Sequence, residues 1–461
     1  MSWKPDHSST ISLFQQISIW IVTQIEQGIW PVGTKLPSQR KLAENLRVNR
    51  STIVQVLDEL KAEGLLVSKA GSGIYVNARS WEYVVKKSAP DWRTRIKQSY
   101  YKSNIQTIQS INEHEMSPQM MRLGTGELSP ELIPTKELQE FMGSISITSR
   151  EFGYSDPMGD RELREVLTRY LHSQGISATP ENILIVSGGL QALQLISIGL
   201  INMYGKIYCQ SPSYLHSLPS LPSEAMNNSQ LNKQSSVLYT IPTLNNPSGK
   251  ILSFEERKRL LEECKKLQLP MIEDGVYQEL IFSESPPSIK SMDTDGQVIY
   301  IGSVSKILSP GLRVGWMVGP ESVMNHLSDL KMQLDYGTSI VSQKIVAAWL
   351  KSSHYHQHMS WLRTELKKRA DFTEKLLQYH FAELANWETP QGGFYIWLKM
   401  KRPVVTKALF QRMLKQNILI NPGYIYQPND YNHIRISYSY CSYQEIEKSL
   451  VALADEIRRY L

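Results

Sequence analysis

The feature that most constrains the fold is an alternation of short apolar runs with longer helix-like stretches from about residue 118 onward. The stretch Phe254–Leu267 is typical, because Ser253 and Glu256 at its start form the pattern of a capping box. Strands joined by helix-length crossovers predict a mostly parallel sheet with helices on both faces, and therefore an α/β domain. The runs that we predict as strands are Ile183–Val186, Ile207–Cys209, Leu238–Ile241, Met271–Glu273, Val298–Ile301 and Gly315–Val318.

The C-terminal part of this region has a different pattern. From about His354, long helices surround two apolar runs, 393–400 and 434–438. We therefore predict one domain over residues 118–461 that includes a smaller C-terminal α+β lobe. A chain of 461 residues is too long for one compact core, so we expect a further domain before residue 118.

Residues 8–79 carry the pattern of a second, smaller domain. Apolar residues recur at helical spacing in three segments, and two short apolar runs then flank a tip that contains Gly71 and Gly73. Three helices followed by a hairpin predict a winged helix-turn-helix, an α+β module. In residues 80–117 charged and polar residues interrupt the apolar periodicity, which predicts a partly ordered linker. The expected helices span 11–25, 39–46 and 49–64, and the expected hairpin strands span 65–67 and 74–76.

Positive charge is concentrated in this first module. The formal net charge of the whole chain is only +6, but Lys35–Arg79 holds eight Lys or Arg against four Asp or Glu. A basic segment on a helix-turn-helix pattern is the electrostatic footprint expected of a DNA-binding domain.

The composition also indicates a compartment. The three cysteines have neither the spacing of a zinc site nor the even number of a disulfide framework, as is typical of a reducing cytosol. The segment Met1–Asp6 lacks the apolar core of a signal peptide. The uncharged stretch Asn182–Gly205 contains too many polar residues for a membrane span, so we predict a buried strand and helix there. We therefore expect a cytoplasmic protein without a membrane segment.

The third helix of the module, expected from Asn49, begins with residues suited to reading DNA. Its N-terminal end offers polar, donor-rich side chains of the kind that meet base edges in the major groove, and an arginine can bond guanine bidentately. The segments 33–43, 48–52 and 60–73 resemble the GntR family of winged-helix regulators. The resemblance favours Arg40, Arg50 and Gly73 as contacts to double-stranded operator DNA. The chemistry of a recognition helix and a wing adds five further candidates, Asn49, Ser51, Thr52, Lys69 and Gly71. The alternative interpretation is a solvated helical bundle with scattered arginines.

A lysine directly after an apolar strand marks a second candidate site. Ser303 and Ser305 precede Lys306, and Arg313 follows it. This arrangement suits an aldehyde cofactor that carries a phosphate, because the aldehyde needs a lysine and the phosphate needs hydroxyl, backbone and arginine donors.

The order of further residues resembles class I aminotransferases of pyridoxal phosphate (PLP) fold type I, from roughly Leu123 to Tyr438. The resemblance implies that Lys306 forms the Schiff base (the internal aldimine), Asp274 contacts the pyridine nitrogen, and Tyr214 stacks on the ring. Asn246 and Tyr277 would bond the phenolate oxygen. The phosphate would be held by Ser187, Gly188, Gly189, Leu190, Ser303, Ser305 and Arg313.

Two more positions extend the resemblance. Tyr154 matches a tyrosine that reaches across a dimer to the neighbour's phosphate, and Arg435 matches the arginine that binds a substrate carboxylate bidentately. Taken singly, these residues have ordinary interpretations: Asp274 could cap a helix, and Lys306 could be a surface charge. The closely spaced His354, His356 and His358 lack an acidic or cysteine partner nearby, so we predict no metal site.

A winged helix fused to an aminotransferase-like domain resembles the MocR/GabR-type regulators. The resemblance implies a dimeric, PLP-dependent transcription factor, bound to the bacterial nucleoid when it occupies DNA, in which an amino compound reacting at Lys306 alters operator binding. The competing hypothesis is an active aminotransferase with an attached DNA-binding head, since Asn246 and Arg435 are both present. A PLP-free amine-binding module is disfavoured by Lys306 and Asp274.

Overall fold

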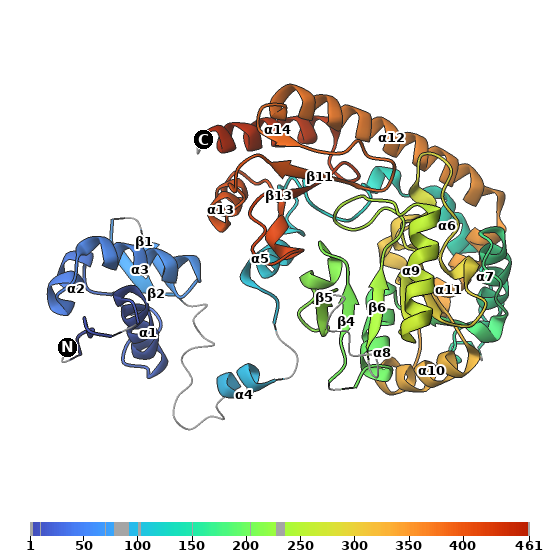
Figure 1. Ribbon diagram of the computed structural model, residues 1–461, viewed down its shortest axis with the longest axis horizontal. Coiled ribbons are helices and arrows are strands. Elements are labelled where there is room, and N and C mark those ends of the chain that lie inside the picture. Colours follow the sequence, from blue (N-terminus) through green and yellow to red (C-terminus); the bar gives the residue numbers. More distant parts are fainter. Residues whose placement is uncertain are drawn as a thin grey trace. The chain divides into compact units, whose positions relative to one another are not determined.

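The chain forms two compact units, Met1–Lys102 and Ser103–Leu461 (Figure 1). The computed structural model describes residues 3–9, 11–69, 71–77, 92–99, 103–149, 151–202, 204–226 and 236–459. Among them, no helix is long and apolar enough to cross a membrane.

The first unit is a winged helix-turn-helix, as predicted. Its core is made by fully buried side chains that include Ile17, Leu42 and Leu57, one from each of the three helices. The Ser38 hydroxyl accepts a hydrogen bond from the Lys41 amide, and this cap starts the second helix at the predicted residue. The elements are α1 (Leu13–Glu26), α2 (Gln39–Leu46), α3 (Arg50–Ala62), the antiparallel strands β1 (Leu66–Lys69) and β2 (Gly73–Val76), and α4 (Trp92–Gln98).

The second unit is built on a seven-stranded sheet with the order β3-β9-β8-β7-β6-β4-β5. The pairs from β5 to β8 are parallel, and β9 runs antiparallel to both of its neighbours. The predicted mostly parallel sheet is therefore confirmed, with a mixed edge. Its strands are β3 (Ile183–Val186), β4 (Ile207–Cys209), β5 (Ser223–Ala225), β6 (Val237–Thr240), β7 (Met271–Asp274), β8 (Val298–Ser303) and β9 (Gly315–Val318).

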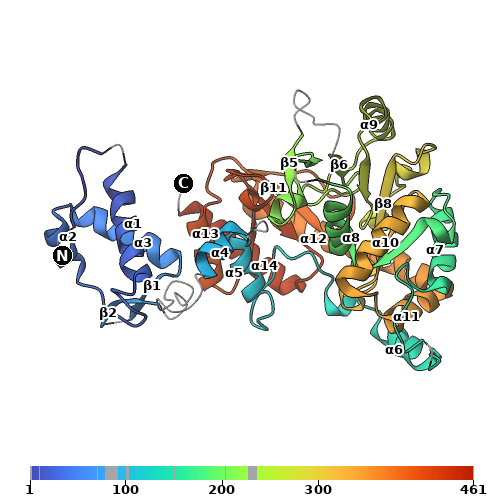
Figure 2. The same cartoon turned by 90° about the horizontal axis from the view of Figure 1, so that it is seen from below.

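Alternate residues of these strands enter two different clusters, which shows that both faces of the sheet are covered. On β6, Leu238 packs with Leu260 and Leu261 of α9 (Phe254–Leu267), whereas Tyr239 joins the main core. Figure 2 shows α9 separated from α7, α10 and α11 by the sheet. The helices of the main core are α6 (Thr135–Ser144), α7 (Arg161–Ser173), α8 (Gly189–Gly199), α10 (Glu321–Asp335) and α11 (Ile340–Lys351).

The C-terminal lobe is α+β, as predicted. A four-stranded antiparallel sheet has the order β10-β11-β13-β12, and the long helices α12 and α14 pack against each other beside it (Figure 1). The elements are α12 (Ser353–Phe381), β10 (Ala385–Asn386), β11 (Tyr395–Met400), α13 (Lys407–Lys415), β12 (Asn421–Pro422), β13 (His433–Ser437) and α14 (Tyr443–Arg458).

The segment predicted as a linker contains a helix of the second unit. Helix α5 (Gln106–His114) buries Ile108 and Ile111 in the main core, and the Thr107 hydroxyl lies 3.2 Å from that of Tyr424. The compact unit thus starts at Ser103, earlier than the predicted boundary at 118, because these side chains pack with it.

Candidate cofactor and DNA-binding sites

The candidate cofactor residues lie where parallel strands end. Asp274 is the last residue of β7, and the one-turn 3₁₀ helix Val304–Lys306 follows β8, which pairs directly with β7. Tyr214 and Asn246 lie beyond the ends of β4 and β6. Ligands of open α/β sheets bind at this edge, because the carboxyl ends of parallel strands and the N-termini of the following helices meet there.

The N-terminus of α8 forms one end of the site. Gly188 is the N-cap, with a φ of 99° that residues with a side chain rarely adopt. A Cβ at Gly188 would come within 2.7 Å of Nη2 of Arg313, and Arg313 itself donates a hydrogen bond to the carbonyl oxygen of Ser187. Backbone amides at a helix N-terminus, with a guanidinium beside them, make a site for a phosphate.

Two hydroxyl groups extend this end of the site. Ser303 Oγ donates to Ser305 Oγ over 2.9 Å and accepts from the Ser305 amide over 3.1 Å. Both serines are buried and both line the same cavity as Arg313. The interlocked bonds fix the positions of the two hydroxyls, which is what anion binding requires.

Lys306 and Arg435 are both oriented by the backbone of one short segment. Lys306 Nζ donates to the carbonyl oxygen of Gly126 over 2.7 Å, and Arg435 Nη2 donates to that of Gly124 over 2.6 Å. Arg435 Nη1 also donates to Oδ1 of Asn246 over 2.6 Å. The bond occupies Oδ1 of Asn246, so Nδ2 is the amide atom that can donate to a ligand oxygen. Arg435 Nε is buried and has no hydrogen-bond partner among the described residues, so this guanidinium retains a donor for a ligand.

Asp274 has a partner that the sequence interpretation missed. The hydroxyl of Tyr239 donates to Oδ2 of Asp274 over 2.6 Å, and the Val276 amide donates to Oδ1 over 3.3 Å. Burial raises the pKa of Asp274, while these two bonds and the positive charge of Lys306 oppose that rise. A tyrosine inside a fully buried strand needs a hydrogen-bond partner for its hydroxyl. Its position in such a strand could therefore have identified Tyr239 from the sequence as a residue with a polar neighbour.

Tyr277 also has an unanticipated partner. Its hydroxyl lies 2.9 Å from that of Tyr395, whose ring in turn lies 4.1 Å from the guanidinium carbon of Arg435. Tyr395 belongs to β11, so the smaller lobe contributes directly to the site. The Gly392–Phe394 segment before it gave no chemical hint of this role.

One cavity of about 540 Å³ brings most of these residues together. Of the predicted residues it does not include Ser187, Gly188 and Tyr154. Tyr154 is 87% exposed and its ring packs against Tyr336 at 4.7 Å, away from the cavity of its own chain. The predicted residues that do line the cavity are Gly189, Leu190, Tyr214, Asn246, Asp274, Tyr277, Ser303, Ser305, Lys306, Arg313 and Arg435.

The side chains present fit pyridoxal phosphate. The glycine at 188 leaves space beside Arg313 that a Cβ would fill, and this suits a phosphate at the α8 N-terminus. Asp274 offers a buried carboxylate for a protonated ring nitrogen, and Lys306 offers an amine for an aldehyde. Arg435, with an unpaired buried donor, offers a partner for a carboxylate.

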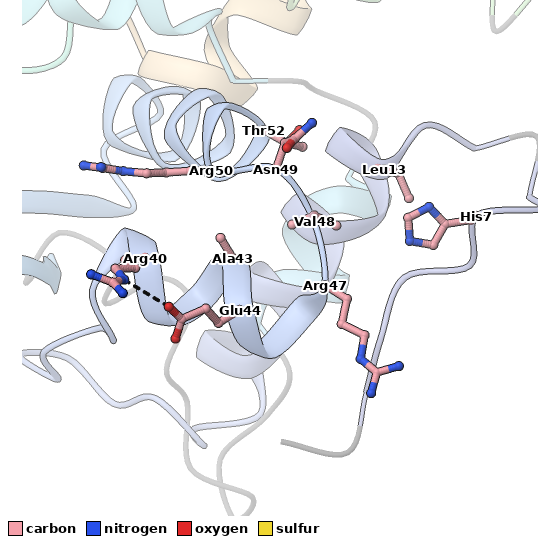
Figure 3. Close-up of a pocket in the computed structure, with 10 residues that line it drawn as sticks. All are labelled: His7, Leu13, Arg40, Ala43, Glu44, Arg47, Val48, Asn49, Arg50 and Thr52. Carbon is pink, nitrogen blue, oxygen red and sulfur yellow. Dashed lines mark hydrogen bonds and ion pairs between the residues drawn. The ribbon is translucent and has the colours of Figure 1, made fainter.

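The DNA-reading candidates surround the turn between α2 and α3. This turn lines a hollow of about 560 Å³ that includes Arg40, Arg47, Asn49, Arg50 and Thr52 (Figure 3). Figure 3 shows Arg40 and Arg50 extending toward the same side, while Arg47 points elsewhere. Asn49 is the N-cap of α3, yet its side chain makes no capping hydrogen bond, and its amide therefore keeps both donor and acceptor for another partner.

The remaining DNA candidates lie on the helix start and on the wing. Ser51 is exposed on the first turn of α3, and Lys69 is exposed at the end of β1 with its Nζ 4.8 Å from the Tyr75 ring centroid. Gly71 and Gly73 have φ values of 69° and 126°, which a tight wing tip requires.

The histidine cluster does not form a metal site among the residues that the structure describes. His358 is buried, its Nε2 lies 3.0 Å from the carbonyl oxygen of Ile307, and burial lowers its pKa.

Comparisons with known proteins identify the family of each unit. The family model of bacterial regulatory proteins of the gntR family matches residues 13–76, and that of aminotransferase class I and II matches residues 118–221 and 223–453. An uncharacterized HTH-type transcriptional regulator of Bacillus subtilis, YisV, is 40% identical over 100% of this chain and 99% of its own length. The HTH-type transcriptional regulator NorG of Staphylococcus aureus is 35% identical over 92% of this chain and 100% of its own.

Solved structures match the second unit. The kynurenine aminotransferase of Pyrococcus horikoshii has a TM-score of 0.69 and 26% identity, covering 77% of this chain and 94% of that one. LysN, an α-aminoadipate aminotransferase of Thermus thermophilus complexed with N-(5'-phosphopyridoxyl)-L-leucine, has a TM-score of 0.68 and 25% identity, covering 80% and 96%. The chain therefore belongs to the MocR/GabR-type regulators of the gntR family, DNA-binding transcriptional regulators that depend on pyridoxal phosphate.

Proposed function

We propose that an amino compound bound in the cavity of the second unit changes the affinity of the winged helix for its operator. The observation that carries this proposal is the meeting of Lys306, Asp274 and Arg435 in one cavity of a chain that also has a DNA-reading module. We place this activity in the bacterial cytoplasm, on the nucleoid when the operator is occupied, because the operator lies there.

Each side chain has a defined task in this proposal. When bound, pyridoxal phosphate supplies an aldehyde that reacts reversibly with amines and a ring that withdraws electrons. Arg435 binds the carboxylate of the amino compound and thereby presents its amino group next to Lys306. Asp274 keeps a proton on the ring nitrogen, and Asn246 and Tyr277 hold the ring oxygen. A ligand shifts DNA binding only by its different affinity for the two shapes of the protein.

Operator binding measured with individual amino acids tests the proposal. The protein is saturated with PLP, and its affinity for the DNA flanking its own gene is measured by fluorescence anisotropy. We expect at least one amino compound to change that affinity by about 5- to 150-fold, the usual range of allosteric coupling. Lys306→Ala and Arg435→Gln should abolish the response but keep the basal affinity. An unchanged affinity with every amino compound would contradict the proposal.

An active aminotransferase is the second candidate function. The cavity contains the groups that an aminotransferase needs. Arg435, which also bonds Asn246, can bind the carboxylate of an amino acid, and Lys306 in the same cavity can move a proton from its Cα. The protein is incubated with amino acids and a 2-keto acid, and the new amino and keto acids are quantified. Steady turnover without any change in operator binding would favour the enzyme over the regulator.

We also propose that the protein acts as a homodimer in which Tyr154 completes the partner's phosphate site. Tyr154 and Phe152 are 87% and 72% exposed, an unusual state for aromatic side chains unless another surface covers them. Analytical ultracentrifugation should show a dimer. Tyr154→Phe should weaken PLP binding while the variant stays dimeric. A monomeric wild type, or a variant that binds PLP as tightly as the wild type, would contradict this role.

A further inference from the structure

Helix α5 forms part of the cavity wall that holds the proposed effector. Four residues of this helix and its C-cap, Ile108, Ile111, Asn112 and Glu115, line the cavity. The first two supply apolar surface, and Glu115 supplies a carboxylate. A ligand fixed at Lys306 and Arg435 would extend its distal end along such a wall.

One acidic side chain of the cavity has no partner in the proposed function. Lys306, Arg313 and Arg435 would bind the aldehyde, the phosphate and a ligand carboxylate, and Asp274 would bind the ring nitrogen. Of the two remaining acids, Glu127 is paired with Arg122 Nη1 at 3.2 Å. Glu115 forms no ion pair with any residue that the structure describes, and its Oε1 accepts a hydrogen bond only from the hydroxyl of Thr125.

The position of Glu115 favours a cation as its partner. It is the C-cap residue of α5, where the helix dipole and the last carbonyl groups already present negative charge. A cation placed beside Glu115 would therefore interact favourably with both the carboxylate and the helix end. The pattern is that expected of a binding group rather than of a stabilising one.

The same three-residue segment joins Glu115 to the reacting groups. Gly124 accepts from Arg435, Thr125 donates to Glu115, and Gly126 accepts from Lys306. Three consecutive residues span at most about 7 to 10 Å. A side chain of three or four methylene groups is therefore long enough to connect the reaction point with Glu115.

A second acceptor lies beside this segment. Asn421 lines the cavity and is only 7% exposed, and its Oδ1 has no hydrogen-bond donor among the described residues. A Cβ on Gly124 would overlap that same oxygen, so Asn421 Oδ1 lies directly against the segment. Two acceptors that have no cationic partner among the described residues, both next to residues 124–126, call for a ligand rich in N–H donors.

We propose that Glu115 selects α-amino acids whose side chain ends in a protonated amine or guanidinium, which rests on the proposed function of this cavity. Arg435 takes the carboxylate, Lys306 yields its position to the α-amino group, and Glu115 takes the distal cation.

Two matched pairs of amino acids test the selection. L-lysine is compared with L-norleucine, and L-ornithine with L-norvaline, because each pair differs mainly in the terminal amine. The absorbance of the PLP-loaded wild type is titrated with each compound. We expect the cationic member to bind at least about tenfold more tightly, the effect of one hydrogen bond to a charged group.

Three variants locate the determinant. Glu115→Gln keeps the shape and the Thr125 bond, and should reduce the preference to about twofold or less while leaving norleucine affinity unchanged. Glu113→Gln, on the exposed side of the same helix, should keep the full preference. A preference that survives Glu115→Gln, or that is lost instead in Glu127→Gln, would overturn the proposal. So would a wild type that binds neither cationic compound or shows no preference.

The titration separates this proposal from the proposed function. A Glu115-dependent preference seen by absorbance without any change in operator affinity would refute regulation by the effector but support the selection. Equal responses of operator affinity to the neutral and cationic members would support regulation but refute the selection.

Discussion

The hydrogen bond between Tyr239 and Asp274 can be tested in the apo protein, because both partners are side chains of this chain and no ligand is needed. Tyr239→Phe removes one hydroxyl from a fully buried strand and changes little else in shape. Asp274 Oδ2 then loses its 2.6 Å donor, and only the Val276 amide, at 3.3 Å from Oδ1, is left among the bonds described for this carboxylate.

The magnitude follows from the charge and the burial of Asp274. A hydrogen bond to a charged group contributes about 1.5 to 3 kcal/mol to stability, and a neutral one about 0.5 to 1.5 kcal/mol. Asp274 is only 6% exposed, which limits the replacement of the lost donor by water from the cavity. We expect Tyr239→Phe to lower the free energy of unfolding of the apo large unit by about 2 kcal/mol at neutral pH.

The loss should depend on pH with a defined sign. Burial raises the pKa of Asp274 above 3.8, so its contribution to stability falls as the pH rises from 3.8 through the pKa of the folded state. The Tyr239 hydroxyl lowers that pKa, so its removal raises the pKa further. The pH range over which stability falls then extends to higher pH. The difference between variant and wild type should therefore be smallest in acid and should grow toward neutral pH.

Urea unfolding of the apo protein, followed by far-UV circular dichroism at about pH 5 and pH 8, measures this difference. Tyr300→Phe is the matched control, because Tyr300 is equally buried on the neighbouring strand β8 and donates no bond to Asp274. Equal losses for the two variants, or a Tyr239→Phe loss that shrinks as the pH rises, would refute the reasoning.

Three other predictions concern separate parts of the molecule. Gly188→Ala should raise the dissociation constant of PLP about tenfold by equilibrium dialysis, since its φ of 99° and the 2.7 Å approach to Arg313 disfavour a Cβ. Arg50→Ala should weaken operator binding by about 1 to 3 kcal/mol in mobility-shift assays and flatten its dependence on salt. Gly302→Ala would overlap the ring of Trp316 and should lower the free energy of unfolding by about 1 to 3 kcal/mol in thermal denaturation.

The sequence was most informative where a local pattern decided the structure. Buried strands such as Ile183–Val186 are continuous apolar runs, and Ser38 marks the start of α2, so both were predicted to the residue. Lys306 and Asp274 were recognisable because each follows or ends such a strand.

Contacts between distant segments were not predictable in the same way. The partner of Lys306, the carbonyl of Gly126, is 180 residues away and carries no side-chain signal. Tyr239 and Tyr395 were not predicted as site residues, since only the folded sheet shows what their hydroxyls meet. Helix α5 was interpreted as linker because its nine residues give too short a periodic pattern to stand out.

That helix has a consequence for how a signal leaves the cavity. Ser103 opens the second unit, and Ile108 and Glu115 already belong to the cavity wall, so the chain that arrives from the DNA-binding head becomes part of the sensor within its first helix. Under the proposed function, a ligand held at Glu115 therefore acts on the same helix, α5, with which the chain enters the second unit.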